Sequence, residues 1–114
     1  SMDYYFRFIS ERYKKPIYIS ENGMSNADII SLDQKCHDPQ RIDYTHRYLM
    51  NLENAIENGA DVRGYFHWSL LDNFEWAHGY RERFGLVHVD YETQKRTPKD
   101  SYYWYKELIE SNKN

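Results

Sequence analysis

The sequence predicts an α/β fold whose strands run parallel. Two short stretches rich in β-branched and aromatic residues, 17–19 and 62–68, each follow a segment in which apolar residues recur at helical spacing. The segment between them is long enough for the crossover helix that parallel neighbours need. Glu21 comes directly after the first stretch, at the kind of strand end where α/β barrels place catalytic residues. We therefore expect the order helix, strand, helix, strand, with chemistry at the strand ends.

The first helix is expected over Asp3–Tyr13, because Phe6 and Ile9 recur there with tyrosines near helical spacing. The step Lys14-Lys15-Pro16 ends this helix, and the β-branched and aromatic residues 17–19 suit a short buried strand. Residues 22–40 then read as a long polar loop. Loops of that length inside a compact unit are usually functional or mobile.

A second, longer helix is expected from Asp38-Pro39 to about Asn58, where Asn58-Gly59 supplies a C-terminal cap signal. One face carries an apolar stripe, and charged residues lie elsewhere. The stripe comprises Ile42, Thr45, Leu49, Leu52 and Ile56, and the charged residues are Arg41, Arg47, Glu53 and Glu57. A second strand is then expected over Val62–Trp68.

The remainder of the chain departs from this regular alternation. Residues 69–80 form an aromatic-rich loop, and residues 84–91 alternate as a short extended piece that turns at Glu92–Lys95. Thr97 is expected to cap the last helix, with Pro98 at its first helical position. That helix is expected to continue to Glu110.

Composition indicates one small domain spanning residues 1–114. The net charge of −3 argues against a nucleic-acid partner, and no apolar run reaches the roughly 18–20 residues of a membrane span. The start shows no signal-peptide pattern, and Cys36 is the single cysteine, so we expect a cytoplasmic protein. Aromatic residues make up 18% of the chain, which fits either a tyrosine-rich core or a carbohydrate site.

The two strand ends would bring chemically useful side chains together. Glu21 lies at the first strand end and Trp68 at the second, with Glu75 and Trp76 in the loop beyond. A carboxylate can attack an anomeric carbon while other polar groups hold sugar hydroxyls. Taken alone, this combination suggests glycosidic-bond chemistry, but two glutamates and two tryptophans could also occur near each other by chance.

Longer motifs carry a family resemblance. Ile-Tyr-Ile-Ser-Glu-Asn-Gly-Met-Ser at 17–25 resembles the nucleophile signature of family 1 glycoside hydrolases, the β-glucosidase family. Trp-Ser-Leu-Leu-Asp-Asn-Phe-Glu-Trp at 68–76 resembles the sugar-binding loop, and the stretches 83–86 and 89–101 continue the likeness. The resemblance implies a (β/α)₈ barrel, of which this chain would be the C-terminal segment. It would supply the seventh and eighth βα units and is incomplete as given.

The resemblance also implies residue roles. Glu21 matches the nucleophile that forms a covalent glycosyl-enzyme intermediate, and Trp68 matches the tryptophan that stacks on the sugar ring. Glu75 matches the hydrogen-bond partner of the sugar 4- and 6-hydroxyls, and Trp76 the donor to the 3-hydroxyl. Phe84 matches a position at the active-site entrance. An anionic Glu75 would repel a 6-phosphate, so a neutral β-glucoside, galactoside or oligosaccharide is expected.

Other polar residues are expected to have structural roles. Asp72 is expected to shape the turn after Trp68, and Arg83 to be solvated or salt-bridged. His67 and His78 could line the site, but a structural role with a hydrogen-bonded ring is the favoured expectation for both. The remaining histidines lack metal-ligand spacing, so neither a metal nor an organic cofactor is expected.

One catalytic part is missing from the sequence. A retaining glycosidase needs a second carboxyl group as acid/base, and the family's Asn-Glu-Pro motif does not occur here. One hypothesis is therefore the C-terminal part of a retaining β-glucosidase, inactive without the N-terminal part of the barrel. The alternative is a non-catalytic chain that self-associates as a homo-oligomer and binds sugar weakly at most.

Overall fold

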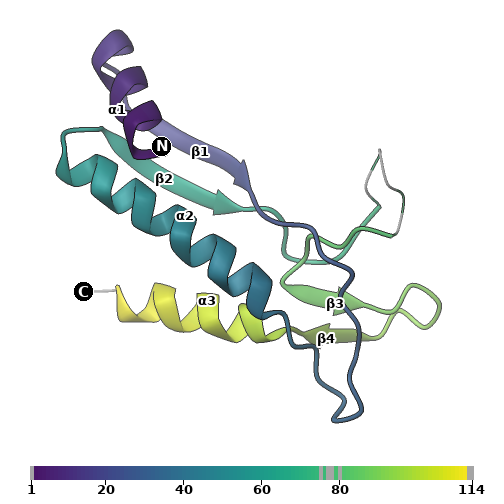
Figure 1. Cartoon of the computed structure of the whole chain (residues 1–114). Helices are drawn as coiled ribbons and strands as arrows, with labels where there is room; N and C mark the ends of the chain where they lie inside the picture. Colours follow the sequence, from purple (N-terminus) through teal and green to yellow (C-terminus); the bar gives the residue numbers. More distant parts are fainter. Residues whose placement is uncertain (1, 75, 77–78, 80, 113–114) are drawn as a thin grey trace.

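The computed structural model describes residues 2–74, 76, 79 and 81–112, and within them the expected alternation of helices and strands is present. The elements are α1 (Met2–Tyr13), β1 (Ile17–Asn22), α2 (Pro39–Glu57), β2 (Val62–His67), β3 (Val87–Val89), β4 (Arg96–Pro98) and α3 (Asp100–Ser111). Strands β1 and β2 pair in parallel, with α2 as the crossover between them (Figure 1). The prediction of parallel strands is therefore confirmed.

A hydrophobic core lies between the β1–β2 sheet and the helices α1 and α2. Its buried members are Phe6, Tyr48, Leu52, Ala55 and Ala60, with Ile19, Leu49, Val62 and Tyr65 packed against them. The alternation of side chains along a strand sends the intervening residues to the opposite face. There Tyr18 and Phe66 are exposed, so the described part of the chain covers one face of this sheet.

Helix α2 differs from its predicted amphipathic pattern at two positions. Thr45 and Leu52 are buried as expected, but Ile56 is 48% exposed and Arg41 is completely buried. Arg41 lies in the first turn, where it forms buried ion pairs that offset the cost of removing its charge from water. The helix ends as predicted, at Asn58 followed by Gly59 with φ of +101°.

The start of the last helix was predicted wrongly. Thr97 and Pro98 lie in β4, where they pair with His88 and Val87 of β3 in an antiparallel hairpin. The backbone N–H of Lys99 extends this pairing by donating to the Leu86 carbonyl at 2.9 Å. Helix α3 consequently begins only at Asp100, because a tertiary strand pairing overrides the local cap signal. None of the helices described is long and apolar enough to traverse a bilayer.

Candidate active site

Glu21 lies near the carboxyl end of β1, and its side chain is exposed. The pairing of β1 with β2 is irregular between Ile19 and Asn22, so Glu21 falls in a stretch outside the regular ladder. Within the described residues its carboxylate has no hydrogen bond or ion pair. A carboxylate in this state is hydrated and open to a ligand from the solvent side.

Trp68 lies beside this strand end. Its backbone N–H donates to the Asn22 carbonyl at 2.8 Å, its side chain is 40% exposed, and the Trp68–Ser69 peptide is cis. Gly23 approaches the same residue so closely that an added Cβ would lie 1.9 Å from the Trp68 carbonyl oxygen. The structure therefore brings the ends of β1 and β2 together, as the parallel arrangement predicted.

The remaining predicted sugar contacts are less completely placed. Glu75 lies outside the described residues, and Trp76 is 90% exposed with its ring edge-on to Phe74 at 5.7 Å between centroids. Phe84 is half-buried, and its carbonyl accepts a hydrogen bond from the Ser69 N–H at 3.1 Å. The roles assigned to Glu75, Trp76 and Phe84 stay predictions.

A buried ion network underlies the two loops that follow the strands. It comprises Asp28, Asp38, Arg41, Asp72 and Lys99, all without exposed side-chain surface, and Arg83 at its edge. Lys99 Nζ lies 2.6 Å from Asp28 and 2.8 Å from Asp72. Arg41 lies 2.7 Å from Asp28 and 2.5 Å from Asp38. Each buried charge thus has an opposite charge within hydrogen-bond distance, as buried charges require.

Asp72 is the member of this network that lies in the predicted sugar-binding loop, between Trp68 and Trp76. It also accepts hydrogen bonds from the backbone N–H of Gly85 at 3.0 Å and of Val89 at 3.3 Å, so its predicted role in shaping this loop is confirmed. Burial acts to raise the pKa of Asp72, but hydrogen bonds from Lys99 and Arg83 outweigh it and hold the pKa below its usual range. Asp72 is therefore a structural anion.

Sequence reasoning missed Asp28, Asp38, Arg41 and Lys99 as members of the network. Lys99 and Asp28 are 71 residues apart, and neither residue type signals burial on its own. The salt bridge of Arg83 to Asp72, at 2.8 Å, agrees with expectation.

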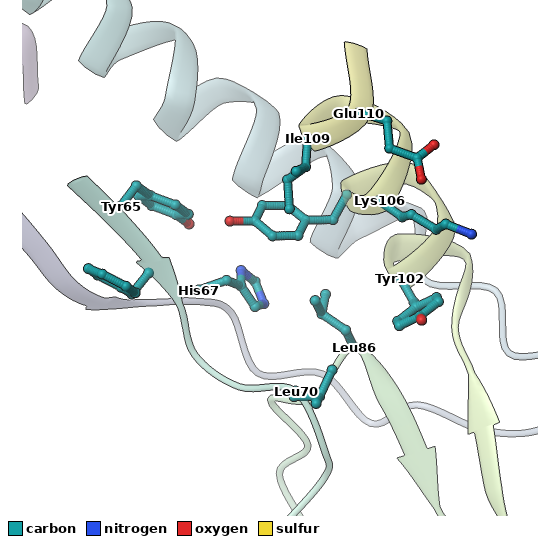
Figure 2. A pocket seen from close by; sticks show the side chains of 10 residues that line it. Tyr65, His67, Leu70, Leu86, Tyr102, Lys106, Ile109 and Glu110 are labelled. Carbon is teal, nitrogen blue, oxygen red and sulfur yellow. The ribbon is translucent and has the colours of Figure 1, made fainter. Parts of the chain in front are cut away.

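A mainly apolar pocket of about 490 Å³ lies between β2 and α3. Figure 2 shows Tyr65 and His67 reaching from β2 toward the side chains of α3, with Leu70 and Leu86 below them. Neither ring nitrogen of His67 has a hydrogen-bond partner in the described structure. Burial, with the cations Arg41 and Lys99, lowers the pKa of His67 to about 4.

The expectation of a hydrogen-bonded His67 was therefore wrong, because the surrounding side chains of β2 and α3 present apolar surface to its ring. His78, the other histidine in that prediction, lies outside the described residues. Among the residues that are described, no group of three or more His, Cys, Asp or Glu side chains could hold a metal ion.

Comparisons with known proteins agree on one family. The sequence profile of glycosyl hydrolase family 1 matches residues 1–114. β-Glucosidase A of Thermotoga maritima is 50% identical over 105 residues, which cover 91% of this chain and 24% of that protein. A 6-phospho-β-galactosidase of Staphylococcus epidermidis is 53% identical over 96 residues, covering 83% of this chain and 20% of that protein.

A solved structure gives the same result. The family 1 β-glucosidase of Thermotoga maritima in complex with isofagomine lactam matches with a TM-score of 0.94 and 46% identity. The match covers 97% of this chain and 26% of that chain. This chain therefore spans about a quarter of the length of the relatives that it matches.

Proposed function

This chain belongs to glycosyl hydrolase family 1, and on that premise we propose that it forms the C-terminal part of a (β/α)₈ barrel. It would contribute the seventh and eighth βα units and require the N-terminal part of the barrel as its partner. The parallel β1–α2–β2 order and the match to a solved β-glucosidase support this placement.

The activity we propose is hydrolysis of a terminal β-glycosidic bond with retention of configuration. The observation that carries this proposal is the exposed Glu21 carboxylate beside Trp68 at the shared carboxyl end of β1 and β2. Glu21 would attack the anomeric carbon, form a glycosyl ester and release the leaving group, and water would then hydrolyse the ester. A second carboxyl group about 5–5.5 Å away must protonate the leaving oxygen, and it would come from the N-terminal part of the barrel.

The proposed substrate is a neutral β-glucoside or β-galactoside. Trp68 would stack on the sugar ring, Glu75 and Trp76 would bind hydroxyls, and Phe84 would border the entrance. The negative charge of Glu75 disfavours a sugar 6-phosphate, although one relative is a 6-phospho-β-galactosidase. A comparison of matched phosphorylated and neutral aryl glycosides tests this choice, and faster turnover of the phosphorylated one would contradict it.

The test of the activity uses a chimera, in which the N-terminal three quarters of Thermotoga maritima β-glucosidase A precede this whole chain. We expect the chimera to hydrolyse 4-nitrophenyl β-glucoside, and neither the 114-residue chain alone nor chimeric Glu21→Gly to do so. With Glu21→Gly, added azide should restore turnover of an activated glucoside and give the α-glucosyl azide. Turnover by the isolated chain, or full activity of Glu21→Gly, would contradict the proposal.

A second candidate function, self-association, has its own supporting observation. In the described structure β1 and β2 form a sheet of two strands whose outer edges are unpaired, and Tyr18 and Phe66 lie exposed on its uncovered face. Such edges and faces favour association. Light scattering should show the isolated chain as an oligomer, whereas a cooperative monomer would contradict this candidate.

A further inference from the structure

The side chain of Asn22 is held between two tyrosines from different elements. The hydroxyl of Tyr65, on β2, donates to Asn22 Oδ1 at 2.9 Å. Asn22 Nδ2 donates to the hydroxyl of Tyr44, on α2, at 3.1 Å. Its backbone carbonyl accepts from the Trp68 N–H, so three polar groups of Asn22 are fixed by three separate residues.

Glu21, the preceding residue, has no comparable restraint from any residue that the structure describes. Its carboxylate is exposed and lies in the irregular part of the β1 ladder. The direction in which the carboxylate points therefore depends on the backbone at Asn22 and on the close approach of Gly23 to Trp68. Nucleophilic attack needs the reacting atoms about 3–3.5 Å apart and aligned, so a small rotation of this backbone would matter.

We propose that Asn22, Tyr65 and Tyr44 form a positioning clamp that aims the Glu21 carboxylate at the anomeric carbon of the sugar. This inference rests on the proposed role of Glu21 as nucleophile. None of the three clamp residues is a catalytic residue, because each acts through the backbone of Glu21.

The chemistry of the clamp explains the residue types that compose it. A side-chain amide offers an acceptor and a donor on one planar group, which lets Asn22 satisfy Tyr65 and Tyr44 together. Burial raises the pKa of Tyr65, so its hydroxyl stays protonated and remains a donor. An aspartate at position 22 would lose the donor to Tyr44 and place a second negative charge beside Glu21.

The test measures the first chemical step in the chimera defined above, with 2,4-dinitrophenyl 2-deoxy-2-fluoro-β-glucoside. Glu21 forms the ester bond to the anomeric carbon while the bond to dinitrophenolate breaks, and this leaving group departs without a proton. Intact-protein mass and peptide mapping follow the labelling of Glu21. We expect Tyr65→Phe to lower the maximal labelling rate about tenfold, which is less than the roughly hundredfold loss that a misplacement by 1 Å can cause. The reagent concentration that gives the half-maximal rate should change little.

Two further variants separate positioning from folding. Tyr44→Phe removes the second contact at a side chain that is 37% exposed, and we expect it also to slow labelling. Tyr105→Phe removes a hydroxyl from the same pocket as Tyr65 without touching Asn22, and it should label at the parent rate. The double variant Tyr65→Phe/Asn22→Ala should be no slower than Asn22→Ala, because residues in one network are not additive.

The outcomes distinguish the clamp from the proposed function. If the parent chimera is not labelled at Glu21, the proposed nucleophile is wrong and the clamp fails with it. If the parent is labelled and both tyrosine variants reach the parent maximal rate, the clamp alone is overturned. Slowing by Tyr105→Phe equal to that by Tyr65→Phe would also overturn it, because the effect would then be general loss of packing.

Discussion

The charges at the end of β1 and the charges of the buried ion network are held in opposite ways. Glu21 is exposed and has no ionic partner among the described residues, whereas Asp28 and Asp72 are fully buried against Lys99 at 2.6 and 2.8 Å. A buried charge must be paired to be tolerated, but an exposed charge at a strand end is stable without a partner. The difference separates carboxylates that maintain the fold from the exposed carboxylate that we propose as the nucleophile.

The largest expected effect comes from removing the cation at the centre of the network. Lys99→Met leaves Asp28 and Asp72 buried without the ammonium group that joins them. Arg41 still contacts Asp28, and Arg83 still contacts Asp72. Breaking a buried pair from one side costs about 3–5 kcal/mol. We expect a loss of that size in the free energy of unfolding, measured by urea denaturation of the 114-residue chain with tryptophan fluorescence. All variants are compared at one protein concentration, because self-association makes the value depend on concentration.

Lys106→Met is the matched control, because Lys106 is an exposed lysine on the neighbouring helix α3. A surface substitution of this kind should change the free energy of unfolding by less than about 0.5 kcal/mol. Equal losses for the two methionine variants would show that the pairing in the network does not carry the stability assigned to it.

The next largest effect should fall on the strand end itself. Gly23→Ala places a Cβ 1.9 Å from the Trp68 carbonyl oxygen, which is backbone and must shift. Because a misplacement of 1 Å can cost about a hundredfold in rate, we expect the chimera to lose about two orders of magnitude in kcat on an aryl glucoside. Gly59→Ala is the control: it strains a backbone with φ of +101° at the end of α2, but no atom lies within 4 Å of its added Cβ. The chimera carrying it should lose stability and keep its kcat.

The sequence predicts the features of the fold and the candidate site that depend on local residue patterns. Parallel strands, the crossover helix and the adjacency of Glu21 and Trp68 follow from short periodic segments and their order. The buried ion network was not predictable, because Lys99 meets Asp28 across 71 residues and a lysine is rarely buried. The start of α3 was misjudged for the same reason: Thr97 pairs with His88 of another strand, and this contact has no local signal.

Two histidines extend the comparison to pH. His67 is half-buried, both of its ring nitrogens are buried without a hydrogen-bond partner in the described structure, and its pKa is lowered to about 4. Its contribution to stability is therefore complete above pH 6.5, the ordinary value, and is lost as the pH falls toward about 4. His37 is exposed, and hydrogen bonds to Asp100 and Asp33, each at 2.7 Å, raise its pKa. Its contribution is present below pH 6.5 and is lost as the pH rises through that raised value.

The measurement is the urea midpoint of the 114-residue chain across both pH ranges. His67→Phe should flatten the decline on the acid side, and His37→Gln should flatten the smaller decline on the alkaline side. If the His67→Phe variant loses stability on the acid side as steeply as the parent chain does, the assignment of that decline to His67 is contradicted.

The smallest effect is expected at an ion pair on the same helix as Arg41. Arg47 and Asp43 are 3.0 Å apart, but their side chains are 76% and 61% exposed, whereas the Arg41–Asp38 pair has no exposed surface. Both pairs join an arginine of α2 to an aspartate three or four residues earlier, so burial is the main difference between them.

Exposed pairs at this spacing contribute about 0.3–0.5 kcal/mol, and we expect Asp43→Asn to lower the free energy of unfolding by no more than that. Asp38→Asn should cost several times as much, because Arg41 loses a charged partner in the interior and the Ser101 N–H and hydroxyl lose the full charge of their acceptor. Similar losses for the two asparagine variants would show that burial does not strengthen the Arg41–Asp38 pair. The contrast between the buried ion network and the exposed Glu21 would then be one of position and not of energy.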